Sequence, residues 1–299
     1  MTYSEIWHRI ATSYDDGEAR AIARILIEEL FGLSYADIVC GATEQLSADD
    51  TLRLDTAVRR IEQGEPLQHV LGYADFCGNR FSVNGSVLIP RPETEWLVDE
   101  GAKLMKGCIA SDETQHKAPH SPKRILDIGT GSGCIAISLK LRLGDAYVEA
   151  WDISEEALRT AQDNADALKA EVVFRKRDAL RADNTAAPWD LIVSNPPYIC
   201  DSERTAMDDN VLLHEPHTAL FVPDDDPLRF YRAIARYALL TLNIGGSLLF
   251  ECNIRYAEAT GKMLSDMGFE EVTVSDDCFN LPRFVRGSSP SQPSPSGRA

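Results

Sequence analysis

Apolar residues in the first 64 positions recur with the period of an α-helix. Residues 18–31 place four apolar side chains on one helical face: Ile22, Ile25, Leu26 and Leu30. A second helix is expected to begin after Ser47, whose hydroxyl suits an N-cap, and to end at Gly64. The N-terminal part of the chain is therefore predicted to be a small helical bundle.

The pattern changes to alternation after residue 72. Residues 73–90 alternate as paired strands do, and the stretch contains the dipeptide Asn84-Gly85. Asn-Gly is typical of a two-residue hairpin turn, because both central positions of such a turn require φ > 0. We therefore predict a β-hairpin that turns at Asn84-Gly85 and links the helical bundle to the rest of the chain.

From residue 124 onward, short apolar runs alternate with helical periods. Four of these runs end in glycine or polar residues: 124–128, 147–151, 171–174 and 190–194. This alternation predicts an α/β fold with a mostly parallel sheet, in which ligands bind at the carboxyl ends of the strands. Two later runs, 245–251 and 271–275, are expected to be terminal strands that pair with each other.

Two segments lack any apolar period. Residues 107–123 contain Gly, Ser, Lys, His and two prolines, which predicts a flexible surface loop. The Ser/Pro/Gly-rich end of the chain predicts disorder. The expected organisation has four parts: a helical domain over 1–72, a hairpin linker over 73–92, a main domain over 93–286 and a disordered tail over 287–299.

Composition narrows the class of protein. The chain has 299 residues, of which 44% are hydrophobic, yet no stretch approaches the roughly 20 apolar residues of a membrane span. We expect a cytoplasmic protein without an export signal. The seven cysteines show no Cys-x-x-Cys spacing, so reduced thiols are expected rather than disulfides or zinc. No metal is expected at His214 and His217 either, because Pro216 breaks the helical spacing.

The charge balance bears on the partner. The chain carries 47 acidic and 30 basic residues, for a formal net charge of −17. Proteins that bind free nucleic acid through its phosphates normally present a basic face, so direct nucleic-acid binding is not expected. A basic protein partner fits this charge better, although ordinary solvated acidity explains it equally well.

The segment Asn195-Pro196-Pro197-Tyr198 follows a predicted buried strand. Two prolines fix φ and donate no hydrogen bonds, which leaves the carbonyls of Asn195 and Pro196 free to accept them. The side-chain oxygen of Asn195 adds an acceptor, and Tyr198 offers an aromatic face for a planar group. The segment is therefore a candidate clamp for an amide or amino NH2 group. A plain strand-terminating turn is the alternative.

A glycine turn lies upstream, between a predicted strand and a predicted helix. Its spacing is Gly-x-Gly-x-Gly, whereas the dinucleotide fingerprint is Gly-x-Gly-x-x-Gly, which argues against NAD. With an acidic residue two positions earlier, it resembles the S-adenosylmethionine loop of class I methyltransferases. This resemblance implies S-adenosylmethionine as the cofactor, and implies these contacts with it: Asp127, Gly129, Thr130, Gly131, Ser132 and Gly133.

Two carboxylates continue this pattern. Asp152 ends the next predicted strand, about 20 residues past the glycine turn, where a doubly wound sheet places a carboxylate on the ribose hydroxyls. Its alternative role is to cap the helix that starts near Ser154. The resemblance places Asp178 near the adenine amino group, and Ala179 where a larger residue commonly packs on the adenine ring. Asn195 is also expected to contact the cofactor.

Three further stretches make the resemblance more specific: Gly-Glu-Pro-Leu-Gln-His-Val-Leu-Gly at 64–72, Leu-Ile-Pro-Arg-Pro-Glu-Thr-Glu at 88–95, and His-Glu-Pro-His-Thr-Ala-Leu at 214–220. Over residues 1–286 the chain resembles the HemK/PrmC family of release-factor glutamine N5-methyltransferases. The family implies a class I methyltransferase fold with a seven-stranded, mostly parallel sheet, and an N-terminal domain that docks the substrate.

The implied reaction is methyl transfer to the side-chain amide of the Gln in the Gly-Gly-Gln motif of peptide chain release factors. Asn195, Pro196 and Tyr198 would be catalytic, and with Pro197 they would bind the substrate amide. We expect a monomer. An amino-group methyltransferase of DNA or RNA, a methyltransferase of a ribosomal-protein glutamine, and a binding module without activity remain alternatives.

One further stretch departs from the family pattern. The family reads more like Leu-Leu-Glu-Ile-Gly, where this chain has Leu-Leu-Phe-Glu-Cys-Asn-Ile at 248–254. Asn253 or Cys252 thus replaces the glycine, and the exchange is expected to change a turn at the cofactor edge without touching the clamp.

Overall fold

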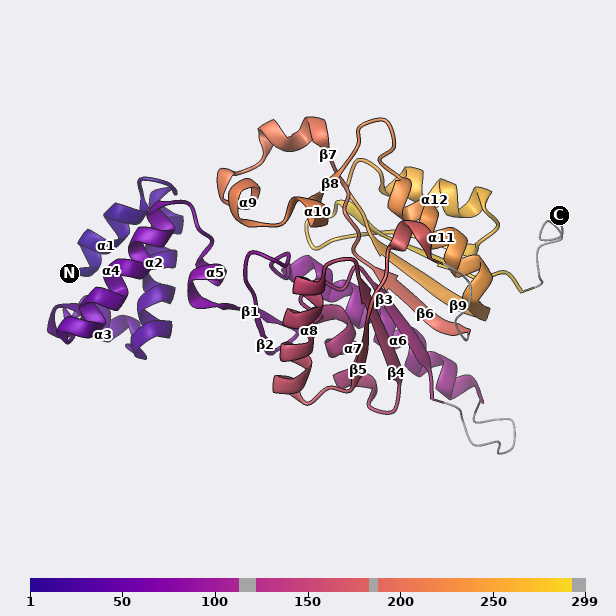
Figure 1. The fold of residues 1–299 in the computed structure, drawn as a ribbon, viewed down its shortest axis with the longest axis horizontal. Helices are drawn as coiled ribbons and strands as arrows, with labels where there is room; N and C mark the ends of the chain where they lie inside the picture. The colour runs from indigo at the N-terminus through magenta and orange to yellow at the C-terminus, as the bar shows by residue number, and fades with distance from the viewer. Residues whose placement is uncertain (113–121, 183–187, 292–299) are drawn as a thin grey trace.

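The computed structural model describes residues 1–112, 122–182 and 188–291. A bundle of helices forms one lobe and a layered α/β body forms the other, joined by a short hairpin (Figure 1). The bundle and its exit consist of α1 (Tyr3–Ile10), α2 (Asp16–Phe31), α3 (Tyr35–Val39), η1 (Ala42–Gln45), α4 (Ala48–Glu62) and α5 (Leu67–Leu71).

The two long helices of the bundle are confirmed, with the expected cap on α4. The Ser47 hydroxyl accepts a hydrogen bond from the Asp50 N–H at 3.1 Å, and the Asp15 carboxylate accepts two at the start of α2. The helix α2 ends at Gly32, which adopts the left-handed φ of 66°. The buried faces of α1, α2 and α4 share a core that includes Ile10, Leu26 and Ile61.

The linker is a hairpin, but it does not turn at Asn84-Gly85. Strands β1 (Tyr73–Phe76) and β2 (Asn79–Ser82) are antiparallel, with Phe76 opposite Asn79. The turn is Cys77-Gly78, whose φ angles of 49° and 75° give the two positive values that such a turn requires. The Asn84 side chain instead accepts the Ser86 N–H at 2.9 Å, which closes a separate turn after β2.

The body contains a seven-stranded sheet in the order β10-β11-β9-β6-β3-β4-β5. Its strands are β3 (Arg124–Ile128), β4 (Tyr147–Asp152), β5 (Val172–Lys176), β6 (Trp189–Ser194), β9 (Leu242–Glu251), β10 (Glu270–Asp276) and β11 (Pro282–Ser288). The five strands from β9 to β5 are parallel, and β11 is antiparallel to both of its neighbours. The predicted strands at 124–128, 147–151, 171–174 and 190–194 are confirmed.

One expectation about strand pairing and two about segment ends were wrong. The strand β11 lies between β9 and β10, so the runs 245–251 and 271–275 do not pair with each other. The same strand continues through Gly287 and Ser288, past the predicted start of the tail. Residues 107–112 belong to α6 and not to a loop. The remainder of the predicted loop at 113–121 and the end of the tail at 292–299 lie outside the described residues.

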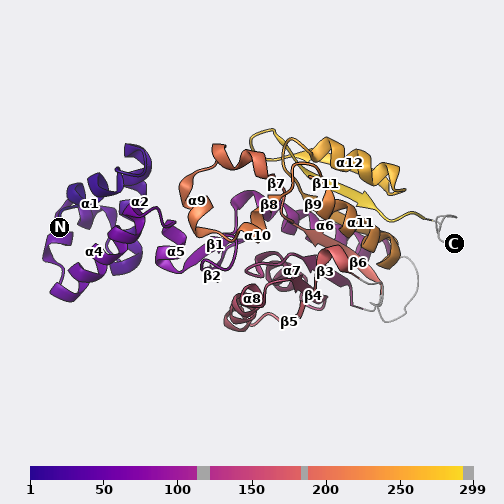
Figure 2. The ribbon, with the colours of Figure 1, turned by 45° about the horizontal axis from the view of Figure 1, so that its top comes forward.

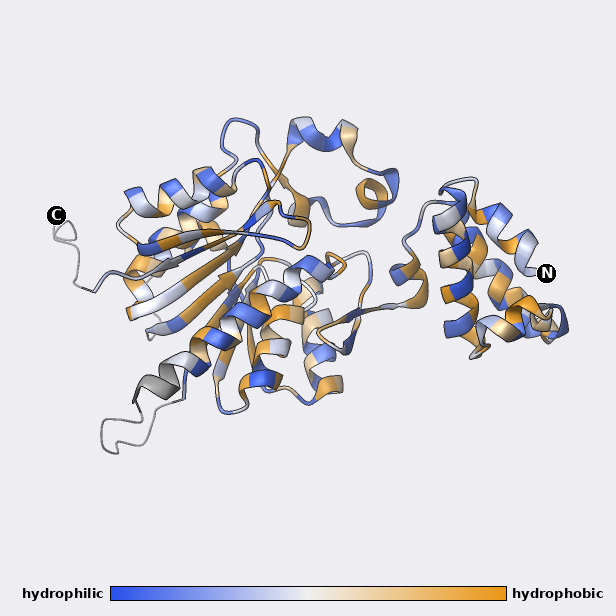
Figure 3. Cartoon of the chain, turned by 180° about the vertical axis from the view of Figure 1, so that it is seen from behind, coloured by the Kyte–Doolittle hydropathy of each residue, from blue (hydrophilic) through white to orange (hydrophobic). Residues whose placement is uncertain are grey.

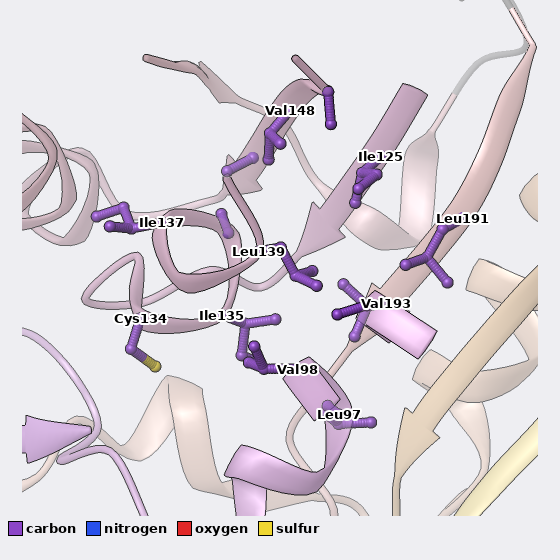
Figure 4. Packing of buried hydrophobic residues seen from close by; sticks show 14 of the residues in the cluster. Leu97, Val98, Ile125, Cys134, Ile135, Ile137, Leu139, Val148, Leu191 and Val193 are labelled. Carbon is purple, nitrogen blue, oxygen red and sulfur yellow. The ribbon is translucent and has the colours of Figure 1, made fainter. Parts of the chain in front are cut away.

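Helices cover both faces of the sheet (Figure 2). They are α6 (Glu95–Asp112), α7 (Cys134–Leu143) and α8 (Glu155–Leu168) in one layer, and α11 (Arg229–Thr241) and α12 (Ala257–Asp266) in the other. Because strand side chains alternate, Leu191 and Val193 pack under the first layer and Ile192 under the second. Figure 4 shows the first of these cores, and Figure 3 shows the apolar strands between more polar helices.

One excursion leaves the sheet between β6 and α11, near the bundle (Figure 1). It contains β7 (Ile199–Cys200), η4 (Asp201–Ala206), α9 (Asp209–His214), α10 (His217–Leu220) and β8 (Phe221–Val222). Two short 3-10 helices complete the chain: η2 (Pro92–Thr94) before α6 and η3 (Ala179–Arg181) after β5. No helix among the described residues is long and apolar enough to cross a membrane.

Candidate active site

The register of four neighbouring strands brings the candidate residues into one row. Ser194 lies opposite Phe250 in β9 and opposite Ile128 in β3, and Ile128 lies opposite Trp151 in β4. The next residue of each chain segment therefore emerges at the same carboxyl edge of the sheet. In spatial order this row is Glu251, Asn195, Gly129 and Asp152.

The Asn-Pro-Pro-Tyr segment is anchored at both of its ends. The Ser194 hydroxyl donates to the Ile128 carbonyl at 2.6 Å, and the Tyr198 N–H donates to the Leu220 carbonyl at 3.2 Å. Between these anchors, neither the Asn195 side-chain oxygen nor the Pro196 carbonyl accepts a hydrogen bond from the described part of the chain. The acceptors expected from the sequence are thus without a partner in the described chain; Asn195 lies at the wall of a cavity, whereas Pro196 is buried.

The nitrogen of the Asn195 side chain is held by a buried polar chain. Asn195 Nδ2 donates to Thr94 Oγ1 at 3.4 Å, and Thr94 Oγ1 donates to Glu251 Oε2 at 2.7 Å. Tyr198 Oη donates to Glu251 Oε1 at 3.3 Å. Burial raises the pKa of Tyr198 and of Glu251, so the phenol stays protonated and serves as a donor. Thr94 and Glu251 were not identified from the sequence.

A cavity of about 160 Å³ opens beside the clamp. Its walls are mostly apolar, and they include one cationic side chain: Leu88, Arg91, Asn195, Tyr198, Ile199, Met207, Val211, Ala219 and Leu220. Arg91 is held by Glu215, whose carboxylate also accepts the Ile89 N–H at 3.2 Å. Glu215, in the segment 214–217, therefore binds the end of the linker beside the cavity. Among the described residues, no cluster of side chains could hold a metal ion.

The glycines of this turn have two different roles: one leaves space for a ligand, and another allows two helices to pack closely. All three glycines have positive φ: 78° at Gly129, 53° at Gly131 and 81° at Gly133. A Cβ at Gly131 would meet no atom within 4 Å, whereas one at Gly133 would lie 2.9 Å from Ile137 Cδ1 and 3.0 Å from Ala161 Cβ. Gly131 therefore leaves space for a ligand, and Gly133 allows α7 and α8 to pack closely.

Asp127 lies fully buried beneath this turn. The Thr130 hydroxyl donates to its Oδ2 at 2.7 Å, and the Ala136 N–H of α7 also favours the charged form, while its buried Oδ1 has no partner at hydrogen-bond distance in the described chain. Burial raises the pKa of this carboxyl to about 7. A buried acceptor without a donor is costly, so this oxygen fits a ligand that brings an ammonium or hydroxyl group.

Asp152 braces the turn. Its Oδ2 accepts the Gly131 N–H and its Oδ1 accepts the Ser154 N–H, both at 2.9 Å. The cap of α8 is Ser154, whose hydroxyl accepts the Ala157 N–H, so Asp152 does not take the alternative capping role. Ile153 follows directly and is 56% exposed at the ligand edge, although sequence analysis did not single it out.

Asp178 and Ala179 lie at the end of the row. Asp178 accepts the Leu180 N–H at 2.9 Å, which caps η3, and its carboxylate lies 3.7 Å from Arg181 Nε. Ala179 packs against the core under α11, partly buried. Its small side chain leaves Ile153 as the larger apolar group at this edge.

The expectation that Asn253 leaves the clamp untouched was wrong. Asn253 Nδ2 donates to the Tyr198 carbonyl at 3.2 Å and to Glu203 Oε1 at 3.2 Å. The reason is the register: β9 ends beside β6, so the residues after Glu251 run alongside the clamp. Asn253 thereby ties the end of the clamp to η4.

Comparison with known proteins gives family matches over both lobes. A model of the PrmC N-terminal domain matches residues 8–72, and a model of the methyltransferase small domain matches residues 95–220. The release factor glutamine methyltransferase of Bacteroides thetaiotaomicron is 44% identical over 273 residues, covering 91% of this chain and 93% of that protein. Its counterpart in Flavobacterium psychrophilum is 36% identical, covering 93% and 94%.

A solved structure supports the fold. The hMettl16 catalytic domain, in complex with MAT2A 3'UTR hairpin 6, matches with a TM-score of 0.50 at 17% identity, covering 82% of this chain and 83% of that one. At this identity the likeness concerns the class I methyltransferase architecture alone.

Proposed function

Because the chain belongs to the release factor glutamine methyltransferase family, we propose that its clamp holds the side-chain amide of a glutamine of a peptide chain release factor. The enzyme transfers a methyl group from S-adenosylmethionine to the N5 nitrogen of that glutamine, within the Gly-Gly-Gln motif. The observation that carries this proposal is the pair of unused acceptors at Asn195 and Pro196, which lie beside the glycine turn.

The residues at the strand ends fit the cofactor. Asp127 Oδ1, buried without a partner, would accept from the ammonium of the methionine part, and Asp152 would accept from the ribose hydroxyls. Ile153 would cover the adenine ring, which Ala179 is too small to do, and Asp178 would lie near its amino group. When bound, S-adenosylmethionine supplies an electrophilic methyl group on a sulfonium.

The clamp overcomes the weak nucleophilicity of an amide. The lone pair of an amide nitrogen is delocalised into its carbonyl, so the nitrogen must be oriented with care. Asn195 Oδ1 and the Pro196 carbonyl accept its two N–H groups, which fixes the nitrogen and stabilises positive charge that develops on it. Well-aligned reactants gain roughly 7–11 kcal/mol over free encounter. The proton leaves after transfer, and we assign no general base.

The cavity walls add the exclusion of water. Leu88, Ile199, Val211 and Leu220 surround the place where the glutamine side chain enters, so the hydrogen bonds at its end form in a dry environment. Electrostatic interactions are stronger in such a medium than in water. Tyr198 forms part of the wall, where its ring can lie against the planar amide.

We also propose that the N-terminal bundle docks the protein substrate, and that the enzyme works as a monomer in the cytoplasm. The net charge of −17 favours a basic protein partner over free nucleic acid. Nucleic-acid amino groups and other protein glutamines remain the competing substrates for a clamp of this kind.

The test uses labelled S-adenosylmethionine with a recombinant release factor, its variant with Ala in place of the motif Gln, a ribosomal-protein mixture, DNA and RNA. We expect label on the release factor and none on its Ala variant. Label on nucleic acid or on ribosomal protein alone, with the release factor unlabelled, would contradict the proposed substrate.

A further inference from the structure

A buried carboxylate lies behind the clamp, outside the cavity walls. Glu251 is 1% exposed at the end of β9. It forms no ion pair within the described part of the chain, and the nearby cation Arg283 pairs with Asp277 instead, at 2.8 Å. Burying a carboxylate without a cationic partner is costly, so a role other than ion pairing is needed to explain this residue.

The hydrogen bonds of Glu251 determine the direction of the bonds that lead to the clamp. An ionised carboxylate accepts hydrogen bonds and donates none. While Glu251 is ionised, the single hydroxyl proton of Thr94 is therefore committed to its carboxylate, at 2.7 Å. The Thr94 oxygen can then only accept on its other side, which faces Asn195 at 3.4 Å. The atom of Asn195 that faces Thr94 must be the donor Nδ2, and Oδ1 must point the other way.

This orientation matters because the two ends of a primary amide have the same shape but opposite polarity. An Asn195 side chain turned by 180° would present its own NH2 group to the NH2 group of the substrate, donor against donor. We propose that Glu251, acting through Thr94, is a positioning residue that keeps the carbonyl oxygen of Asn195 directed at the substrate amide. The inference rests on the proposed function of the clamp.

The hydrogen bonds from Glu251 through Thr94 to Asn195 make turnover sensitive to acid. A protonated Glu251 can donate to Thr94, and the Thr94 hydroxyl can then donate toward Asn195, which reverses every bond. The groups that act on the titration of Glu251 are Thr94, Tyr198, Arg283 and Glu93. Because burial raises the pKa of this carboxyl, kcat should fall at the acid end of the pH profile, measured with saturating cofactor.

Substitutions separate positioning from simple structural support. Thr94→Val and Glu251→Gln should each lower kcat on the order of 10- to 100-fold, with the Kd for S-adenosylhomocysteine unchanged within about twofold. Thr94→Ser, which keeps the hydroxyl, should retain most of kcat. The double variant Thr94→Val/Glu251→Gln should lose no more kcat than the more impaired single variant, because both substitutions interrupt the same series of hydrogen bonds. In Glu251→Gln the acid limb of kcat should disappear.

Glu149→Gln is the matched control. Glu149 is also a buried strand glutamate that accepts from a phenol and an indole, at 2.8 Å from Tyr147 Oη and 2.7 Å from Trp151 Nε1. Unlike Glu251, it also pairs with Arg175, at 3.0 Å, and it lies away from the clamp in β4. Its exchange should leave the kcat profile intact. Wild-type kcat in Glu251→Gln, multiplied losses in the double variant, or equal losses in Thr94→Ser and Thr94→Val would overturn the proposal. If Glu251→Gln does not fold, the comparison of Thr94→Ser with Thr94→Val tests the proposal by itself.

A second readout needs no protein substrate. In 15N NMR spectra with S-adenosylhomocysteine, the side-chain amide of Asn195, assigned with Asn195→Ala, should shift in Thr94→Val and Glu251→Gln but not in Glu149→Gln. If the Asn195 resonance does not move in these variants, the proposed orientation of Asn195 by Glu251 and Thr94 is refuted, even if the enzyme is active. Conversely, a wild-type enzyme that labels no release factor would refute the proposed function, while the NMR shifts would still decide the role of Glu251.

Discussion

Asn195 combines two jobs in one side chain. Its nitrogen is occupied by Thr94, and its oxygen has no partner in the described structure, so the oxygen is the group that a substrate can use. Asn195→Ala should lower the rate of glutamine methylation by roughly 10²–10³, because one preorganised acceptor is lost. Cofactor affinity, measured by calorimetry, should fall far less than the rate, although Asn195 is also expected to contact the cofactor.

Asn243→Ala is the control for this change. Asn243 binds Asp190 at 3.0 Å, at the opposite end of β6 from the clamp. It should keep its turnover, so that an equal loss in both variants would point to general destabilisation. Unchanged turnover in Asn195→Ala would remove the clamp from the mechanism.

Asp127 gives a prediction about pH. Its folded pKa of about 7 lies above the ordinary value, because burial disfavours the charged form. The stability that the neutral acid contributes is complete below pH 4 and is lost as the pH rises through about 7. Asp127→Asn should therefore raise the melting temperature of the ligand-free protein at pH 8 more than at pH 5. A uniform shift at both pH values would contradict this.

The same residue predicts how cofactor binding depends on pH. An ammonium group needs the ionised carboxylate, so the affinity for S-adenosylmethionine should rise between pH 6 and pH 8 in the wild type. In Asp127→Asn the affinity should be weaker and flat over this range. Calorimetric titration at several pH values measures both, and a parallel slope in the variant would assign the dependence elsewhere.

At the scale of elements, the junction of α7 and α8 depends on Gly133. A methyl group there would lie 3.0 Å from Ala161 Cβ in a backbone with φ of 81°. Gly133→Ala should cost about 1–3 kcal/mol of unfolding free energy, through crowding and backbone strain. Urea denaturation measures this loss.

Gly131→Ala is the matched comparison, two residues away in the same turn. Its φ of 53° is strained for alanine by roughly 1–2 kcal/mol, but its Cβ meets no protein atom. Gly131→Ala should therefore lose less unfolding free energy than Gly133→Ala, but should lose more cofactor affinity. The reverse order would indicate that the ligand lies on the other side of the turn.

The strands whose side chains are buried on both faces could be predicted from their apolar runs, and the site followed from the residues at their ends. The hairpin turn could not, because Asn84-Gly85 has the stronger local signal while Cys77-Gly78 has the positive φ angles. The strand β11 was missed because Pro282, two arginines and Gly287 interrupt its apolar pattern. Its position is set by pairing on both edges.

The hydrogen bonds that connect Glu251 to Asn195 through Thr94 could not be predicted either, for a different reason. Thr94, Asn195 and Glu251 come from three separate segments, and only the register of β6 against β9 brings two of them together. A single sequence contains no local signal for such a pairing. The glutamate in an otherwise apolar run at 248–252 was the one available indication.

For the molecule as a whole, net charge predicts the behaviour of the encounter with the substrate. If the acidic surface attracts a basic release factor, the association rate constant should fall on the order of tenfold between about 50 and 500 mM salt. Stopped-flow measurements test this, with cofactor binding as the reference that should change less. A flat response would leave the charge of −17 as ordinary solvated acidity.

The excursion between β6 and α11 has a consequence for engineering. Most of the described cavity wall beyond the clamp belongs to residues 199–220, and the parallel pair β7 and β8 joins the two ends of this stretch. Both ends of the segment thus meet side by side at one seam. A homologous segment from another methyltransferase could be grafted there as a single cassette, exchanging acceptor preference while the cofactor half of the enzyme stays unaltered.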